Sequence, residues 1–188
     1  MELPKSIEEP LLVLRSQAGD EAAFTQIVQR YHTRVHYYLK KMLGPDRADD
    51  AVQELWIDVF RSIPKLRDVS LFTSWLYRLA RDRAFRTMRS AAPPAVDLSQ
   101  LDVPDEPDDS EFSREDAARV HVALDQLAPE HREVLLLRFM ESMTYPQIAS
   151  VVGCELGTVR SRIHYAKRAL RRLLEKDQHE QRIRIGTH

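Results

Sequence analysis

The chain has 188 residues, 43% of them hydrophobic, which suffices for one medium domain or two small ones with cores of their own. A single cysteine excludes an intramolecular disulfide framework, and the acidic N-terminus MELPKSIEEP lacks the apolar core of a signal peptide. No apolar run in the sequence approaches the length of a membrane span. We therefore expect a cytoplasmic protein without disulfide bonds.

The net charge of -1 conceals an uneven distribution of charge along the chain. Residues 1–90 carry 15 basic and 12 acidic side chains, and residues 114–188 carry 13 and 10. Between them, residues 91–113 carry 7 acidic side chains, four prolines and no basic residue, which predicts a flexible linker and a domain boundary. Two slightly basic modules joined by an acidic linker fit a protein that binds nucleic acid with both ends.

An all-α fold with two small helical domains is expected from composition and spacing. Glycine is rare, with five residues, and the sequence has no alternating runs of Val, Ile and Thr. Apolar positions at helical spacing predict four helices in the first module: over 10–18, from Asp20 to the Gly44-Pro45 break, over 46–62 and over 72–89.

The helix predicted over 46–62 has an acid-rich outer face. Its buried side is expected to hold Ala48, Val52, Leu55, Trp56, Val59 and Ile63. The outward positions are Asp49, Asp50, Gln53, Glu54, Asp58 and Arg61. Such a face is either solvated or a docking surface for a basic partner, and periodicity does not decide between the two.

The helix predicted over 72–89 combines five arginines with the aromatic residues Trp75, Tyr77 and Phe85. Aromatic rings stack on unpaired bases while guanidinium groups neutralise phosphates, so this helix is a candidate for binding single-stranded nucleic acid. We expect Trp75 and Leu79 to be buried rather than to contact bases. The arginines are harder to explain as scaffold; they are Arg78, Arg81, Arg83, Arg86 and Arg89.

The second module is predicted to contain four helices. Ser113 and Asp116 resemble a capping box for a first helix that turns Ala117, Val120, Leu124 and Leu127 inward. Pro129 starts a second helix, over 129–140. The tail over 176–188 is polar and has no clear partner.

The stretch from Thr144 to Leu174 has the order and spacing of a helix-turn-helix. A short helix over 145–152 ends at Gly153, and a turn leads to a second helix from Gly157 onward, whose inward stripe is Val159, Ile163, Ala166 and Leu170. From residue 156 to 172 there are six Lys or Arg and no acid. These features indicate a DNA-reading module; the alternative is a basic amphipathic helix with a solvated outer face.

The N-terminal part of the second helix of a helix-turn-helix meets base edges in the major groove. The candidate readers are therefore Thr158, Arg160, Ser161, His164 and Tyr165. The later Arg and Lys residues are better placed for phosphates.

Taken together, these stretches resemble the bacterial sigma factors of the extracytoplasmic-function (ECF) type, the smallest members of the sigma-70 family, from about residue 11 to 175. The matching strings are GDEAAFTQIVQRY, DDAVQELWIDVFR, FTSWLYRLARDRA, LAPEHREVLLLRFMESMTYPQIASVVGC and GTVRSRIHYAKRAL. Five such strings in this order, divided by a short acidic linker, are very specific.

The resemblance implies a promoter-specificity subunit of bacterial RNA polymerase that is not an enzyme. It implies a sigma-2 domain over 1–90, the linker over 91–113, a sigma-4 domain over 114–175 and a polar tail over 176–188. This chain would dock on the clamp helices of the largest polymerase subunit through its residues Asp50, Gln53 and Glu54. Sigma-4 would contact the flap of the second-largest subunit.

The same resemblance assigns promoter contacts. Single-stranded DNA of the -10 element would be bound by Arg78, Arg81, Asp82, Arg83 and Arg86, with the loop after Leu66. Duplex DNA of the -35 element would be read by Thr158, Arg160, Ser161, Arg162, His164, Tyr165 and Arg168. No cofactor, metal or small-molecule substrate is implied. An anti-sigma factor is a further expected partner, and a membrane-anchored one would hold the protein at the inner face of the membrane.

Two positions depart from the family pattern. Asp82 stands where the family usually has Asn, and a carboxylate cannot donate an amide hydrogen bond to a flipped base. Tyr165 stands where the family often has Arg, which replaces a bidentate guanidinium by a ring and a hydroxyl. The promoter sequences of relatives are therefore not transferable to this chain.

Two other classes of protein remain as rivals at this point. A stand-alone helix-turn-helix regulator that binds duplex operators would explain the C-terminal module but not the helix over 72–89. A metal-dependent hydrolase would use His32, His36 and an acid such as Asp49 or Asp50, but no nucleophile or Gly-rich loop accompanies them. Cys154 is expected to be a small buried filler, with redox sensing as the alternative.

Overall fold

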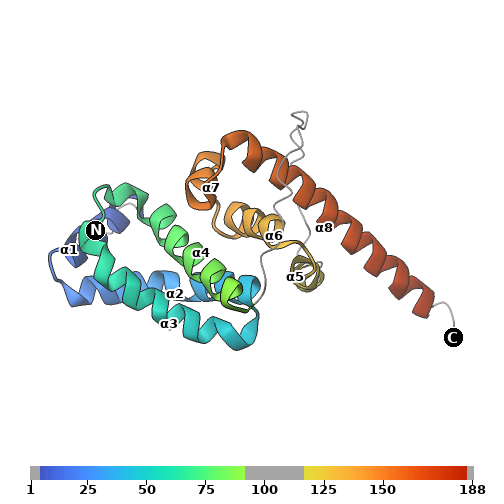
Figure 1. The fold of residues 1–188 in the computed structure, drawn as a ribbon, viewed down its shortest axis with the longest axis horizontal. Helices are drawn as coiled ribbons and strands as arrows, with labels where there is room; N and C mark the ends of the chain where they lie inside the picture. Colours follow the sequence, from blue (N-terminus) through green and yellow to red (C-terminus); the bar gives the residue numbers. More distant parts are fainter. Residues whose placement is uncertain (1–4, 92–116, 186–188) are drawn as a thin grey trace. The chain divides into compact units, whose positions relative to one another are not determined.

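The computed structural model describes residues 5–91 and 117–185, and every element within these ranges is helical (Figure 1). This confirms the expected all-α fold. The predicted linker, from residue 92 onward, and the capping box at Ser113 and Asp116 lie outside the described residues. None of the described helices is long and apolar enough to cross a membrane.

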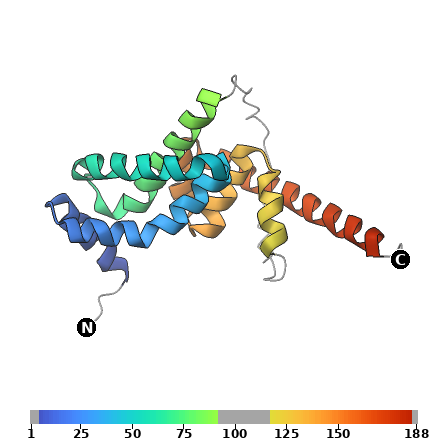
Figure 2. The same ribbon diagram turned by 90° about the horizontal axis from the view of Figure 1, so that it is seen from below.

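The chain divides into two compact units, and the first consists mostly of four helices. These are α1 (Lys5–Gln17), α2 (Glu21–Leu43), α3 (Pro45–Ser62) and α4 (Phe72–Ala91). Two short 3-10 turns, Ile63–Lys65 and Val69–Leu71, connect α3 to α4. Helices α2 and α3 form an antiparallel pair, α4 packs on both, and α1 packs on α2 (Figures 1 and 2).

The ends of α2 are set by local signals that the sequence predicts. The Asp20 carboxylate caps its N-terminus by accepting a hydrogen bond from the Ala23 amide at 3.0 Å. The same hydrogen bond, together with the Arg15 guanidinium, lowers the pKa of Asp20 below its ordinary value. At the other end Gly44 adopts a φ of 84°, which a residue with a side chain rarely tolerates. The chain therefore turns sharply into α3, which Pro45 opens.

Helix α1 begins at Lys5 rather than at Pro10, so the predicted start was wrong. The added turn carries Glu8, which pairs with Arg30 of α2, and Glu9, which accepts a hydrogen bond from the hydroxyl of Tyr31. These contacts with α2 compensate for the backbone hydrogen bond that Pro10 cannot donate inside the helix. The start of a helix that tertiary contacts decide is not visible in local spacing.

The core of the first unit is built around buried aromatic residues. Tyr31 packs edge-on against Phe72, and Tyr38 packs edge-on against Tyr77, with ring centroids 5.5 Å apart in each pair. Tyr31, Tyr38, Phe72 and Tyr77 are all buried. Burial of a large apolar side chain stabilises the fold by about 1.5–3 kcal/mol.

In the first unit, Trp56, Trp75 and Leu79 were predicted to be buried and are half-buried. The same holds in the second unit for Val120, predicted to turn inward, and for Cys154, predicted to be a buried filler. The indole N–H of Trp56 donates to His32 Nδ1 at 3.2 Å, which keeps the ring at the edge of the α2–α3 pair. Tyr77, which was counted only among the aromatic residues of its helix, is fully buried instead of Trp75.

The second unit contains α5 (Ala117–Asp125), α6 (Pro129–Leu135) and α8 (Leu156–Ile185). Helix α7 (Tyr145–Val152) is joined to α8 by a short turn. Helix α6 continues into a π-helical turn, Leu136–Met140, so the predicted 129–140 segment is helical throughout. Gly153 ends α7 with a φ of 69°, and Cys154 beside it is half-buried. The predicted order of helices in the helix-turn-helix is confirmed.

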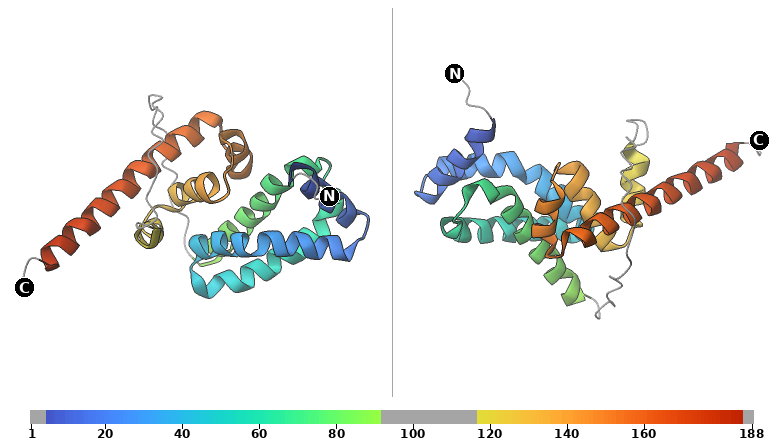
Figure 3. Two further views of the ribbon diagram at one scale, coloured as in Figure 1. Left: turned by 180° about the vertical axis from the view of Figure 1, so that it is seen from behind. Right: turned by 90° about the horizontal axis from the view of Figure 1, so that it is seen from above.

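Helix α8 is longer than predicted, because it continues through the expected polar tail to Ile185 (Figure 3). The Arg119 guanidinium of α5 accounts for part of this continuation. Its Nε contacts the Asp177 carboxylate at 2.8 Å, and its Nη2 donates to the Leu174 carbonyl at 2.9 Å. The start of the tail, for which the sequence shows no clear partner, therefore has one in α5.

Candidate functional site

The outer face of α3 is a stripe of exposed side chains bounded by two helices. Asp50, Gln53 and Glu54, the residues expected to contact core polymerase, are all exposed. They lie on one stripe because residues three and four apart share a helix face. Ile57 belongs to the same stripe and leaves 49% of its surface exposed. The flanks of the stripe are occupied by α2 on one side and α4 on the other.

An apolar patch adjoins this stripe on the side of α2. Phe60 is 57% exposed and packs edge-on against Phe24 of α2, with ring centroids 5.1 Å apart. Trp56 also meets Phe24 edge-on, at 6.3 Å. Sequence reasoning missed Ile57 and Phe60, although sorting α3 by angle would have placed Ile57 between Gln53 and Glu54. Exposed large apolar side chains beside a polar stripe are typical of a binding surface.

On the side of α4, Glu54 is held by Arg83. The two terminal nitrogens of Arg83 pair separately with Glu54 and with Asp58, one turn further along α3. Only 16% of the Arg83 side chain is exposed. One residue expected to bind DNA and one expected to bind polymerase therefore contact each other in the free protein.

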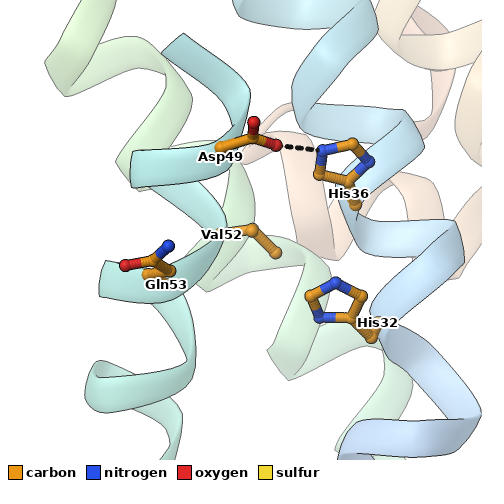
Figure 4. A pocket seen from close by; sticks show the side chains of 5 residues that line it. All are labelled: His32, His36, Asp49, Val52 and Gln53. Atoms are coloured by element: carbon orange, nitrogen blue, oxygen red, sulfur yellow. Dashed lines mark hydrogen bonds and ion pairs between the residues drawn. The ribbon is translucent and has the colours of Figure 1, made fainter. Parts of the chain in front are cut away.

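The imidazoles of His32 and His36 lie stacked on α2 at the edge of a shallow hollow shared with α3 (Figure 4). His36 Nε2 lies 2.7 Å from the Asp49 carboxylate, and His32 Nδ1 accepts the hydrogen bond from Trp56. Within residues 5–91 and 117–185, no group of three or more His, Cys, Asp or Glu side chains is placed to hold a metal ion.

The exposed stripe of α4 carries most of the residues expected at the -10 element. Arg78, Asp82 and Arg86 are exposed and lie within about 80° of one another around the helix. Arg81 is half-buried and lies over the ring of Phe85, 4.4 Å from its centroid. A guanidinium stacked on a partly exposed ring offers both charge and a flat surface to an unpaired base. Arg83 lies further round the helix, toward α3, about 60° beyond Arg86 and 140° from Arg78.

The loop before α4 is held by α1. The side-chain amide of Gln17 donates to the carbonyls of Ile63 at 2.9 Å and Leu66 at 2.7 Å. Asp68 then caps the short turn that follows, by accepting from the Ser70 amide at 3.0 Å. Leu71 is left half exposed at the start of α4. The predicted -10 loop is thus fixed at one end and presents an apolar side chain at the other.

The first turns of α8 present the residues expected at the -35 element. Arg160 and Arg168 are exposed, and the half-buried members of the set are Thr158, Ser161, Arg162, His164 and Tyr165. The predicted inward stripe is confirmed, because Val159, Ile163, Ala166 and Leu170 are all buried. The Ser161 hydroxyl donates back to the Thr158 carbonyl at 3.0 Å, which leaves its oxygen as an acceptor.

Side chains of α8 interact with one another and with residues that precede the helix-turn-helix. His164 and Tyr165 contact edge-on, with ring centroids 5.6 Å apart. Burial lowers the pKa of His131 below its ordinary value; the charge of Glu130 opposes this shift and that of Arg162 adds to it. Lys167 lies over the exposed ring of Phe139, 5.5 Å from its centroid. Phe139, in the π-helical turn, was not among the predicted site residues.

Comparison with known proteins identifies the family of the chain. Family models match the chain twice: Sigma-70 region 2 over residues 27–93 and Sigma-70, region 4 over residues 117–170. The ECF RNA polymerase sigma-E factor of Haemophilus influenzae is 33% identical over 178 residues, which cover 88% of this chain and 94% of that protein. The chain belongs to the ECF sigma factors of the sigma-70 family. This sigma factor is a promoter-specificity subunit of RNA polymerase, and it is not an enzyme.

The sigma factor shares its fold with solved structures. CnrH, in complex with the cytosolic domain of CnrY, matches with a TM-score of 0.67 at 24% identity, covering 90% of this chain and 99% of that chain. The sigma factor RpoE of Bartonella quintana, in complex with the anti-sigma factor NepR, matches with a TM-score of 0.62 at 20% identity, covering 81% and 96%. Family membership excludes the hydrolase, and it excludes a stand-alone helix-turn-helix regulator because region 2 is also present.

Proposed function

We propose that this sigma factor docks on the clamp helices of the largest polymerase subunit through the outer stripe of α3. The observation that carries the proposal is that Asp50, Gln53 and Ile57 are exposed while α2 and α4 cover the helix on both sides. Two polar side chains around one exposed aliphatic residue suit a partner helix with basic and apolar positions. Phe60 extends this surface toward α2.

The exposed stripe of α4 binds the -10 element as a single strand. Arg78 and Arg86 neutralise phosphates, while Arg81 on the Phe85 ring and the half-buried Trp75 offer stacking surfaces. Asp82 stands among these cations as an exposed hydrogen-bond acceptor. A carboxylate accepts from the exocyclic amine of cytosine, so its presence changes the base preference at this position.

The first turns of α8 bind the -35 element as a duplex. Thr158, Arg160, His164 and Tyr165 lie where the second helix of a helix-turn-helix meets base edges. Arg162 and Arg168 lie nearer the phosphates. The exposed Phe139 and Met140 of the preceding turn form an apolar surface for the flap of the second-largest subunit.

These surfaces belong to two domains, over 1–90 and 114–175, with residues 91–113 as the connection. An anti-sigma factor is a further partner, by analogy with the complex of RpoE and NepR. Such a partner would hold this sigma factor inactive in the cytoplasm, or at the inner face of the membrane if it is itself anchored there.

The experiment that tests the proposal separates docking from promoter reading. Run-off transcription with core polymerase and a pool of promoter fragments identifies cognate promoters. The variant Asp50→Ala with Gln53→Ala is expected to lose co-purification with core polymerase. Glu54 is left unchanged in this variant, because it also holds Arg83 and its loss would disturb α4.

A matched variant on the other surface is Arg160→Ala. We expect it to bind core polymerase like the wild type and to lose about tenfold in initiation from cognate promoters, since one base contact is worth about 1–3 kcal/mol. Loss of core binding in Arg160→Ala, or unchanged core binding in the α3 variant, would contradict the assignment of the two surfaces. Absence of transcription above core alone, with active core, would remove the proposal altogether.

A further inference from the structure

Arg83 ties α4 to α3 through two carboxylates. Its Nη1 pairs with Glu54 and its Nη2 with Asp58, so each terminal nitrogen of the guanidinium holds a different residue of α3. The side chain is 16% exposed, whereas those of Glu54 and Asp58 are 57% and 40% exposed. Arg83 is therefore the most buried side chain of the three, and the two carboxylates lie between it and solvent.

Arg83 also lies away from the surface that faces DNA in the proposed function. Along α4 it is rotated by about 140° from Arg78, whereas Asp82 and Arg86 are rotated by about 40° and 80°. The exposed residues of the stripe carry no ion pair to α3 comparable with that of Arg83 among the described contacts. To reach a phosphate, Arg83 would have to give up both carboxylates and leave two like charges four residues apart on α3.

We infer that Arg83 is a positioning residue, which sets the orientation of the -10 helix α4 relative to the polymerase-docking helix α3 and does not itself contact DNA. This inference rests on the proposed function of the two helices. A planar guanidinium whose two terminal nitrogens bind two carboxylates fixes both the distance and the angle between the helices, which a single point charge does not. Because Glu54 belongs to both the docking stripe and this cluster, polymerase docking and the placement of α4 share one residue.

The test uses holoenzyme assembled at saturating sigma factor on a promoter fragment found by run-off transcription. Arg83→Met keeps the aliphatic stem and removes the charge. We expect about five- to tenfold weaker binding of a single-stranded probe carrying the -10 element, which is about 1–1.4 kcal/mol. Binding of a duplex carrying only the -35 element is expected to stay within twofold of wild type. Arg83→Lys is expected to recover only part of the loss, because an ammonium cannot bridge both carboxylates in a fixed plane.

The salt dependence of probe binding separates positioning from contact. A phosphate contact adds about 0.7 to the slope of log affinity against log salt for a single strand. A positioning residue leaves that slope unchanged, so Arg83→Met is expected to weaken binding equally at all salt concentrations. A slope lowered by about 0.7 would show that Arg83 touches a phosphate and would overturn the inference.

Asp58→Asn supplies the second arm, because Asp58 is not part of the docking stripe. We expect a smaller loss from Asp58→Asn, and we expect the double variant with Arg83→Met to be no worse than Arg83→Met alone. Additive losses would contradict the coupling. Arg15→Met, which removes the ion pair with Asp20 at 2.7 Å, is the matched control and is expected to leave probe binding unchanged. If the wild type drives transcription and Arg83→Met binds the -10 probe as tightly as the wild type, the inference is rejected and the proposed function stands.

Discussion

At the scale of single residues, several arginines of this sigma factor serve as structural ties. Arg83 joins α4 to α3, and Arg119 joins α5 to Asp177 of α8. Arg132 of α6 acts at the end of α5, where its guanidinium donates to the carbonyls of Leu124, Asp125 and Leu127, each at 2.8 Å. The last carbonyls of a helix have no partners within the helix, so this arginine supplies what α5 lacks.

The capping role of Arg132 predicts that the stability of the protein depends on both the charge and the shape of this side chain. Arg132→Met is expected to lower the free energy of unfolding by about 1–3 kcal/mol, since the carbonyls lose a charged donor. Arg132→Lys is expected to fall between, because one ammonium cannot reach all three oxygens. Denaturant unfolding followed by circular dichroism measures both. Arg168→Met, an exposed arginine of α8, is the control and is expected to stay within about 0.5 kcal/mol of wild type.

The distinction between tying and exposed arginines was not predictable from composition. Arg83 and Arg86 are the same residue type on one helix, yet Arg83 pairs with α3 while Arg86 is exposed. Sequence reasoning grouped them because it counted charges along α4 without knowing where α3 lies. The pairing requires the α3–α4 packing, which no local pattern contains. Inward residues were easier: all four apolar positions predicted for the inward stripe of α8 are buried, because burial follows helical period directly.

At the scale of elements, α1 supports the loop that leads into α4, the helix proposed to bind the -10 element. Gln17, its last residue, donates hydrogen bonds to the carbonyls of Ile63 and Leu66, which follow α3 in the chain. Glu9 of the same helix accepts hydrogen bonds from the hydroxyl of Tyr31 in α2 and from that of Thr73 in the first turn of α4. Burial, and then the hydrogen bond to Glu9, raise the pKa of Tyr31, which keeps its hydroxyl protonated as a donor. Helix α1 thus contacts both ends of the α3–α4 connection.

This arrangement predicts that Gln17→Leu destabilises the loop before α4 more than it destabilises the helices of the domain. The substitution keeps the volume of the side chain and leaves two partly buried carbonyls without their donor, at an expected cost of about 1–2 kcal/mol. Hydrogen exchange at the amides of residues 66–71 is expected to accelerate more than exchange in α2. Gln29→Leu, at an exposed position of α2, provides the comparison. Equal exchange rates in the loop of both variants would contradict the role of Gln17.

The misplaced helix ends have the same kind of cause. Helix α1 starts at Lys5 and α8 ends at Ile185, each beyond the predicted limit. In both cases a long-range ion pair lies in the unpredicted part, between Glu8 and Arg30 and between Asp177 and Arg119. By contrast, the ends of α2 and α7 were predicted from Asp20, Gly44 and Gly153, whose effects are local.

At the scale of the whole molecule, net charge says little about how this sigma factor binds DNA. A formal charge of -1 from 28 basic and 29 acidic residues gives no reason to expect attraction to a polyanion. The charges are segregated, however: residues 156–172 of α8 carry six basic side chains and no acid, while the exposed stripe of α3 carries Asp50 and Glu54. Local fields of this kind, rather than the total, steer association.

This segregation predicts that the exposed arginines of α8 supply salt-dependent affinity for duplex DNA. Arg168 and Arg172 are exposed and lie on its outer face, beyond the turns proposed to meet base edges. Because each phosphate contact contributes about 0.9 to the slope of log affinity against log salt for a duplex, Arg168→Ala with Arg172→Ala is expected to lower the slope by about 1.8. The measurement is a salt titration of holoenzyme on a duplex carrying the -35 element. Lys40→Ala, an exposed cation of α2, is expected to leave the slope unchanged. If the double variant kept the wild-type slope while its affinity fell, these arginines would act on bases or on folding and not on phosphates.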